Sequence, residues 1–175
     1  SCISAAAELG IVVLDGDYTG RAIPEIQQTT PFIYEQNLTP VVACDGWGDM
    51  ATIESAVNWR MVERIGKQLA VAGFSYSAQA GFFADGASTK KALIHGTMSD
   101  CYEVGKALRL AVEAGLDPAD TIAEKVGGWV ICKGTVTGKH VEDKDDYYWA
   151  THDITGTGAY DGVNLKVWLK NENHM

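Results

Sequence analysis

Long apolar runs, paired cysteines and an excess of positive charge are all missing from this sequence of 175 residues. No window approaches the roughly 18 apolar residues that a membrane-spanning helix needs, so no segment is expected to cross a membrane. No basic, apolar leader is visible, so we expect no signal peptide and a cytoplasmic protein. The net charge of -9 disfavours phosphate backbones and anionic lipid surfaces, so neither nucleic acid nor membrane is an expected partner.

The cysteines and histidines also lack the spacings that mark metal or disulfide sites. The four cysteines form no C-x-x-C pair and are typical of reduced thiols; they are Cys2, Cys44, Cys101 and Cys132. The histidines form no H-x-x-x-H or H-E-x-x-H pair, so their spacing gives little support for a zinc site. Internal repeats and low-complexity segments are absent. What is present is an ordinary globular composition, with enough apolar residues for a core.

The pattern over residues 1–128 predicts an α/β domain. A helix closing on Gly10 leads into Ile11–Leu14, a short apolar run that predicts a buried strand, most simply in a parallel sheet. Val41–Cys44 repeats this pattern, and a helix capped by Asn58 should follow. Another helix should be capped by Thr97 or Ser99 and end at Gly115, and Asp117 should cap the helix after it. We therefore expect part of a mostly parallel, layered α/β domain that lacks its N-terminal portion.

From residue 129 onward the pattern changes to strands. Apolar and polar residues alternate cleanly over Val163–Lys170, and shorter strands are predicted at Trp129–Cys132 and Tyr147–Ala150. The segments between them have the composition of exposed hairpin turns. Residues 129–175 are therefore expected to start a second, antiparallel β-rich domain that is barrel- or sandwich-like.

The segment Asp15–Glu25, directly after the first predicted strand, is the main candidate site. In an extended segment Asp15 and Asp17 would share a face, where they would either bind a cation or share a proton with one pKa raised, as suits a general base. Arg21 would be their counter-ion or a clamp for a substrate carboxylate. Glu25 follows a proline and is a third candidate catalytic carboxylate. The alternative is an Asp-Gly turn with solvated charges.

Three further places supply candidate residues. Asp45 follows the second apolar run as Asp15 follows the first, although Asp-Gly there also fits a hairpin. His95 precedes a predicted helix start, where free N–H groups bind anions, which makes His95 a candidate catalytic group with a plain loop residue as the alternative. The candidate substrate-binding residues beyond these are Gly96 and Thr97 at that helix start and Glu172 and Asn173 after the last strand.

Several blocks of the sequence resemble the S-methyl thiohydantoin desulfurase family, a group of hydantoinase-associated proteins. The most specific block is Gly10–Asp17, continued by Gly20–Glu25. Supporting blocks, in matching order and spacing, are Lys91–Ser99, Gly105–Leu108 and Asn171–Asn173. The resemblance covers nearly the whole chain and implies an α/β domain and a β-barrel-like domain, in proteins about twice this length.

The resemblance also implies hydrolytic removal of sulfur from a five-membered cyclic amide-like ring. On this basis we expect a hydrolase for a hydantoin- or thiohydantoin-type substrate, with the acidic turn activating water or holding a metal. The cofactor stays open, with a divalent metal such as zinc on Asp15 and Asp17 as one option. The alternative is a non-catalytic subunit or ligand-binding module that supports a hydantoinase- or oxoprolinase-type partner. A homo-oligomer is expected in either case.

Overall fold

The computed structural model describes residues 2–145 and 147–174, with the backbone alone for residues 173 and 174. Its contacts divide the chain into two compact units, each assembled from two stretches of sequence. We call Ser1–Gly20 with Leu93–Ile131 the helical unit, and Arg21–Ala92 with Cys132–Met175 the sheet unit. The predicted division into successive domains, 1–128 and 129–175, stays a prediction, since these units interleave along the chain.

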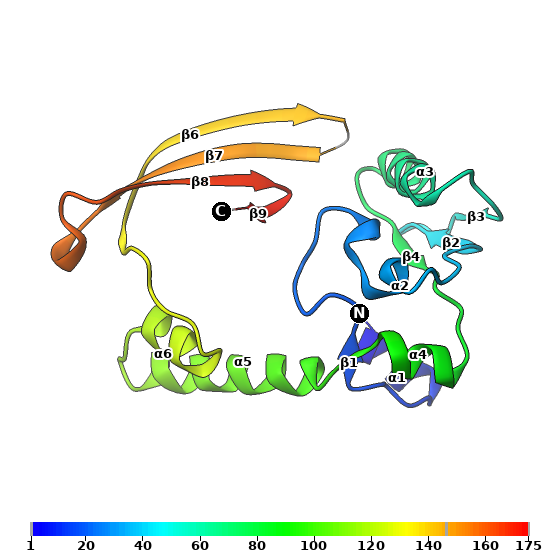
Figure 1. The fold of residues 1–175 in the computed structure, drawn as a ribbon, viewed down its shortest axis with the longest axis horizontal. Helices are drawn as coiled ribbons and strands as arrows, with labels where there is room; N and C mark the ends of the chain where they lie inside the picture. The colour runs from blue at the N-terminus through cyan, green and yellow to red at the C-terminus, as the bar shows by residue number, and fades with distance from the viewer. Residues whose placement is uncertain (1, 146, 175) are drawn as a thin grey trace. The chain divides into compact units, whose positions relative to one another are not determined.

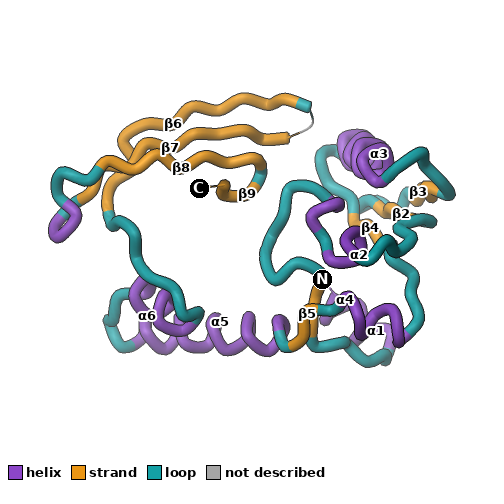
Figure 2. Tube along the Cα trace, in the orientation of Figure 1, coloured by secondary structure: helices purple, strands orange, loops and turns teal. Residues whose placement is uncertain are grey.

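Helices make up most of the helical unit (Figure 2). They are α1 (Cys2–Leu9), α5 (Thr97–Glu113) and α6 (Pro118–Lys125). Gly10 and Gly115 follow two of them with φ of 66° and 68°, the left-handed conformation that ends a helix at little cost for glycine. Asp117 begins the third, accepting the N–H of Ala119 at 2.8 Å. The predicted ends at Gly10 and Gly115 and the cap at Asp117 are confirmed, whereas the cap predicted at Thr97 or Ser99 is wrong because Gly96 is the N-cap residue of α5.

The predicted strand Ile11–Leu14 is wrong, because these residues adopt no regular secondary structure. Their side chains are exposed, most of all Val12 at 88%. Pairing begins only at β1 (Gly16–Asp17), which runs antiparallel to β5 (Ile94–His95). An apolar run predicts a buried strand only if another segment pairs with it, and no described segment does so here.

The first part of the sheet unit is a three-stranded sheet packed on a helix. Its elements are η1 (Ile26–Gln28), α2 (Thr30–Ile33), β2 (Val41–Cys44), β3 (Met50–Ile53), α3 (Trp59–Ala72), β4 (Ala78–Ala80) and α4 (Gly86–Ala92). Strand β2 is central and pairs antiparallel with both β3 and β4. Its inward residue Val41 joins Leu38, Ile53 and Val62 of α3 in a buried cluster. This cluster is the core of the unit.

At the start of each of the two longer helices of this part, a polar side chain accepts a backbone N–H. Asn58 caps α3 by accepting the N–H of Met61 at 3.0 Å, as predicted. The helix turns Trp59, Val62 and Leu69 toward the core. Asp85 accepts the N–H of Ser88 at 2.8 Å where α4 begins. Helix α4 was not predicted, since Asp85-Gly86 also has the composition of a turn.

The second part of the sheet unit is a four-stranded antiparallel sheet with strands in sequence order (Figure 1). Its strands are β6 (Gly134–Lys144), β7 (Tyr147–Gly156), β8 (Asn164–Lys170) and β9 (Glu172–His174). The register of β6 against β7 shifts between Val136 and Gly138, which indicates a β-bulge. Residues 129–132, predicted as a strand, lie before β6 in irregular structure.

The fold therefore combines helices with antiparallel sheets. All strand pairs among residues 2–145 and 147–174 are antiparallel, so the mostly parallel sheet that we expected is not found there. The described strands of the second sheet form an open ladder and close no barrel. Within the same residues, no helix has both the length and the apolar character to cross a membrane.

Candidate functional site

The carboxylate of Asp15 caps helix α5 from a distant part of the sequence. Its Oδ1 accepts the N–H of Ser99 at 3.0 Å, and its Oδ2 accepts the Ser99 hydroxyl at 2.6 Å. The helix has Gly96 at its N-cap position and so has no capping side chain of its own. A helix start attracts negative charge. The charge that we expected a ligand to bring to this helix start is supplied by Asp15 itself.

Asp17 holds the turn that follows β1. Its Oδ1 accepts the N–H of Thr19 at 2.7 Å and of Gly20 at 2.6 Å, which is the side-chain-to-backbone pattern of an Asx turn. Gly16 lies against β5, where a Cβ atom would come within 2.6 Å of the Ile94 carbonyl oxygen. The close approach that glycine allows here is therefore to a neighbouring strand.

Both aspartates have lowered pKa values. Hydrogen bonds from the hydroxyl and then the N–H of Ser99 lower the pKa of Asp15 from its ordinary 3.8. Partial burial raises the pKa of Asp17, but hydrogen bonds from Gly20 and Thr19 outweigh the burial, and the net pKa is lowered. A general base that shares a proton needs a raised pKa. The expected raised pKa is therefore not found at either residue.

The two aspartates also do not fit the metal site that was one option. Both oxygens of Asp15 already accept hydrogen bonds from Ser99. The described residues contain no group of three or more His, Cys, Asp or Glu side chains arranged to hold a metal ion. Zinc and other divalent metals need several such ligands. We therefore derive no step through a metal.

The residues predicted around the start of α5 lie beside these aspartates in the helical unit. His95 pairs with Gly16 across β5 and β1, and its side chain is exposed. Gly96 has φ of 85°, and its N–H donates to the carbonyl oxygen of Asp15 at 2.9 Å. The Thr97 hydroxyl is buried without a hydrogen bond of ordinary geometry, although it lies close enough to Asp17 to help lower that pKa.

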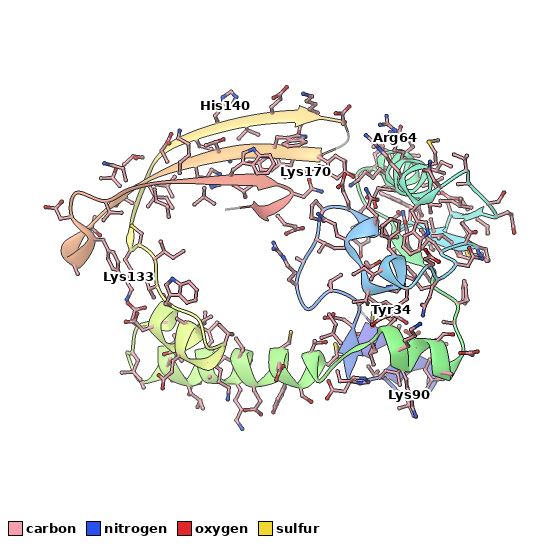
Figure 3. The ribbon with its side chains drawn as sticks, in the orientation of Figure 1. Tyr34, Arg64, Lys90, Lys133, His140 and Lys170 are labelled. Atoms are coloured by element: carbon pink, nitrogen blue, oxygen red, sulfur yellow. The ribbon has the colours of Figure 1, made fainter. Side chains whose placement is uncertain are left out.

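Glu25 belongs to the sheet unit, where it pairs with a lysine from β8. Lys170 Nζ lies 2.7 Å from Glu25 Oε1, and the two side chains are only 16% and 25% exposed. Figure 3 labels Lys170 near the end of β8. Partial burial makes such a pair stronger than a fully exposed one, but it also makes the loss of either partner more costly.

Tyr147 of β7 lies next to this pair and between charges of both signs. The ammonium groups of Lys67 and Lys170 lie 4.1 Å and 4.2 Å from the centre of its ring. Burial raises the pKa of Tyr147, and the charges of Glu63 and Glu25 with a hydrogen bond to Glu25 raise it further. The phenol therefore stays protonated at neutral pH and can serve as a hydrogen-bond donor.

An open cavity of about 680 Å³ lies beside Tyr147 in the sheet unit. Helix α3 contributes Lys67, Ala70 and Val71 to its wall, and β7 contributes Tyr147 and Tyr148. Cavities of a few hundred Å³ or more with mixed apolar and polar walls are typical of small-molecule sites. The cavity is therefore a candidate binding site that was not predicted from the sequence.

The remaining predicted residues lie elsewhere in the sheet unit. Asp45 Oδ1 accepts three backbone N–H groups of its hairpin loop, those of Trp47, Gly48 and Asp49, at 2.9–3.0 Å. The Arg21 side chain is exposed, and its Nε donates to the carbonyl oxygen of Ala22. Glu172 pairs with Lys170 across β9 and β8. Asn173 pairs with Leu169 in the same ladder, and its side chain lies outside the described part.

Comparison with protein families now adds to this geometry. The S-Me-THD-like N-terminal domain matches residues 1–55, and the S-Me-THD-like C-terminal domain matches residues 57–175. The chain belongs to the S-Me-THD-like family. The resemblance noted in the sequence blocks is thereby confirmed.

This S-Me-THD-like chain also resembles a solved structure. A crystal structure of a protein from Chromobacterium violaceum superposes with a TM-score of 0.70 at 19% sequence identity. The match covers 96% of this chain and 45% of that one, so the chain spans less than half of its structural relative. At this identity the likeness shows the fold alone. A search of curated proteins found no match.

The lysines and tyrosine of the cavity were missed in the sequence of this S-Me-THD-like chain. Lys67 had no predicted role, and Tyr147 was predicted only as a strand residue. The alternation of β8 offered one signal, because it places Lys170 opposite Trp149 on a face rich in aromatic residues. The contact of Lys170 with Glu25 spans 145 positions, and no local pattern indicates it.

Proposed function

We propose that this S-Me-THD-like protein is a hydrolase acting on a hydantoin- or thiohydantoin-type five-membered cyclic amide. The observation that carries the proposal is the match of both S-Me-THD-like domains along the chain, at residues 1–55 and 57–175. The cavity of about 680 Å³ supports it further, because a substituted five-membered ring fits within that volume. The proposal concerns the substrate class and the type of reaction.

The proposed reaction replaces sulfur by oxygen in an S-methyl thiohydantoin ring. A water oxygen bonds to the ring carbon that carries sulfur, and the carbon–sulfur bond breaks. The sulfur leaves as methanethiol with one proton from water, and the other proton ends on the ring. The ring carbon becomes a carbonyl, so the product is a hydantoin. No oxidant or reductant is required.

Candidate roles for the predicted residues follow from their chemistry. One alternative for the carboxylate that acts on water is Asp17 of the helical unit, which is ionised at neutral pH because its pKa is lowered and would orient water better than it would deprotonate it. Asp15 would keep the start of α5 in place through Ser99. The other alternative for the carboxylate that acts on water is Glu25 of the sheet unit, which Lys170 holds in place. Arg21 would bind a carboxylate substituent of the substrate.

The test measures turnover of S-methyl thiohydantoins by the purified protein. A thiol reagent detects the methanethiol that is released. Asp17→Asn and Glu25→Gln keep the shape of each side chain and remove its charge. A loss of at least about 100-fold in kcat for one variant would identify the carboxylate that acts on water. Lys166→Met, which alters an exposed side chain of β8, is the control for nonspecific loss. Absence of thiol release from every ring tested would contradict the proposal.

A specific observation favours a second candidate, a ligand-binding module that supports a hydantoinase-type partner. Four predicted acidic side chains already have hydrogen-bond or ion-pair partners: Asp15, Asp17, Glu25 and Asp45. A carboxylate occupied in this way is a poor base. Calorimetric binding of a thiohydantoin without release of thiol would favour this candidate over the hydrolase.

A further inference from the structure

The wall of the cavity beside Tyr147 includes a lysine, Lys67. Lys67 lies on the α3 wall, and its side chain is 20% exposed. An ammonium group has three N–H donors. Among the described residues its contacts are a 3.4 Å pair with Glu63 Oε1 and the ring of Tyr147 at 4.1 Å. Neither contact is a short hydrogen bond, so the ammonium keeps donor capacity on the cavity wall.

Neighbouring groups fix the position of this ammonium. Glu63 Oε2 accepts the N–H of Ile26 at 2.8 Å, which orients the carboxylate that pairs with Lys67. The Tyr147 ring that Lys67 contacts is itself flanked by Lys170, which Glu25 holds at 2.7 Å. A donor held before a substrate arrives needs no reorganisation during the reaction, which is the condition for strong electrostatic stabilisation.

Among the described residues of the cavity wall, the positive and negative charges balance. Its charged residues are Lys67, Lys144, Asp143 and Asp145, two of each sign, whereas the whole chain has a net charge of -9. Ala70, Val71 and the tyrosine rings supply apolar surface. Such a wall suits a neutral ring with a polar edge better than a highly charged ligand.

We propose that this cavity binds the uncharged ring of a cyclic amide and that Lys67 donates a hydrogen bond to the ring carbonyl oxygen. The inference rests on the proposed ring hydrolysis for its chemistry. When water attacks the carbon that carries sulfur, the electron pair of the ring C=N bond shifts onto nitrogen and into the adjacent carbonyl group. When water attacks a hydantoin carbonyl, the negative charge forms on that oxygen directly. In both cases charge builds up where the Lys67 ammonium is placed to stabilise it.

Glu63 is then a positioning residue, because it acts on the substrate only through Lys67. Its replacement by glutamine keeps the shape but weakens the hold on the ammonium. We expect Glu63→Gln to lower kcat more than it raises KM, since a misplaced donor fails mainly in the transition state. If Glu63 had a purely structural role, Glu63→Gln would lower the free energy of unfolding and leave kcat and KM of the folded protein unchanged.

The experiment measures two properties of the intact protein and its variants. One is turnover of an S-methyl thiohydantoin, and the other is calorimetric binding of the corresponding hydantoin, which has no sulfur to lose. Lys67→Met should lower kcat/KM by about 100-fold or more and abolish measurable hydantoin binding. Lys67→Arg should restore part of both. Lys166→Met, which changes an exposed lysine of β8 outside the cavity wall, should alter neither by more than about twofold.

The outcomes separate this inference from the proposed function. Turnover by the wild type that survives Lys67→Met would overturn the role of Lys67 and leave the hydrolase proposal standing. Hydantoin binding that depends on Lys67, without turnover of any ring, would support the cavity site and contradict the hydrolase. Failure of the wild type to bind or convert any ring would overturn both. Circular dichroism and thermal unfolding establish that each variant is folded.

Discussion

Different interactions stabilise the helical unit and the sheet unit, each considered by itself. In the sheet unit, Leu38, Val41, Ile53 and Val62 form a buried apolar cluster. In the helical unit, the buried apolar side chains among the described residues are those of Ala6 and Ala111. An alanine side chain is a single methyl group, so it buries little apolar area. The helical unit therefore depends more on caps and turns, such as the Asp15 contacts with Ser99.

This difference does not come from a shortage of apolar residues. The helical unit contains Ile11, Val12, Leu110 and Trp129, and all four are exposed. An apolar residue stabilises a fold only where another element faces it. The sheet unit has such facing elements, with α3 packed on β2 and β3. The comparison shows that caps and turns stabilise the helical unit, whereas apolar packing between elements stabilises the sheet unit.

The largest expected effect is on the core of the sheet unit. Leu38 is 2% exposed, so Leu38→Ala should lower the free energy of unfolding by about 2–5 kcal/mol. The matched change Leu110→Ala, at a position 55% exposed on α5, should cost less than about 0.5 kcal/mol. Urea unfolding with hydrogen exchange resolved by unit measures both. Equal costs would show that the apolar side of α5 is covered in solution.

Two lysines of β8 provide the next contrast, within the sheet unit. Lys170→Met leaves the partly buried Glu25 without its partner and should cost about 1–2 kcal/mol. Lys166 also pairs with an acid, Asp153 at 2.6 Å, but these side chains are 67% and 49% exposed. Lys166→Met should therefore cost less than about 0.5 kcal/mol. A double-mutant cycle of Lys170 with Glu25 measures the coupling, and a value near zero would contradict its importance.

Local signals in the sequence predicted most of the helices and the first hairpin. The helix stops at Gly10 and Gly115 and the caps at Asn58 and Asp117 depend on neighbouring residues, so they are visible in a single sequence. The run Ile11–Leu14 misled us because its burial depends on a partner strand, and a partner strand is not a local property.

The candidate site was less predictable for the same reason. Asp15 and Ser99 are 84 positions apart, and their contact assigns to Asp15 a cap that the sequence attributed to Thr97 or Ser99. Asp15 was predicted as a catalytic carboxylate, but it caps a helix in the structure because the fold brings it next to Ser99. Lys67, Tyr147 and Glu25 come from three separate segments, and only the folded chain brings them together.

The two units should also respond to opposite extremes of pH. In the sheet unit the pKa of Tyr147 is raised above its ordinary value of 10.0. Above about pH 10 the unfolded chain loses this proton while the folded chain keeps it, so the folded state binds more protons. Stability should be fully present below pH 10 and should fall as the pH rises further. Tyr147→Phe should reduce this alkaline loss, which urea unfolding between about pH 9 and 11 measures, with Tyr148→Phe as control.

In the helical unit the change in stability with pH has the opposite sign. The pKa of Asp17 is lowered from its ordinary 3.8, so below that pH the unfolded chain binds a proton that the folded chain still excludes. The stabilisation is present above about pH 4 and is lost as the pH falls toward the folded pKa. Asp17→Asn should therefore lower stability at neutral pH by a small amount and flatten the acid side of the curve. Asp100→Asn, on the same unit, is the control because the pKa of Asp17 does not depend on it. Because Asp17 accepts the N–H groups of Thr19 and Gly20, hydrogen exchange of those two amides should report the loss first. Unchanged exchange at both amides would contradict the view that local carboxylate bonds hold this unit together.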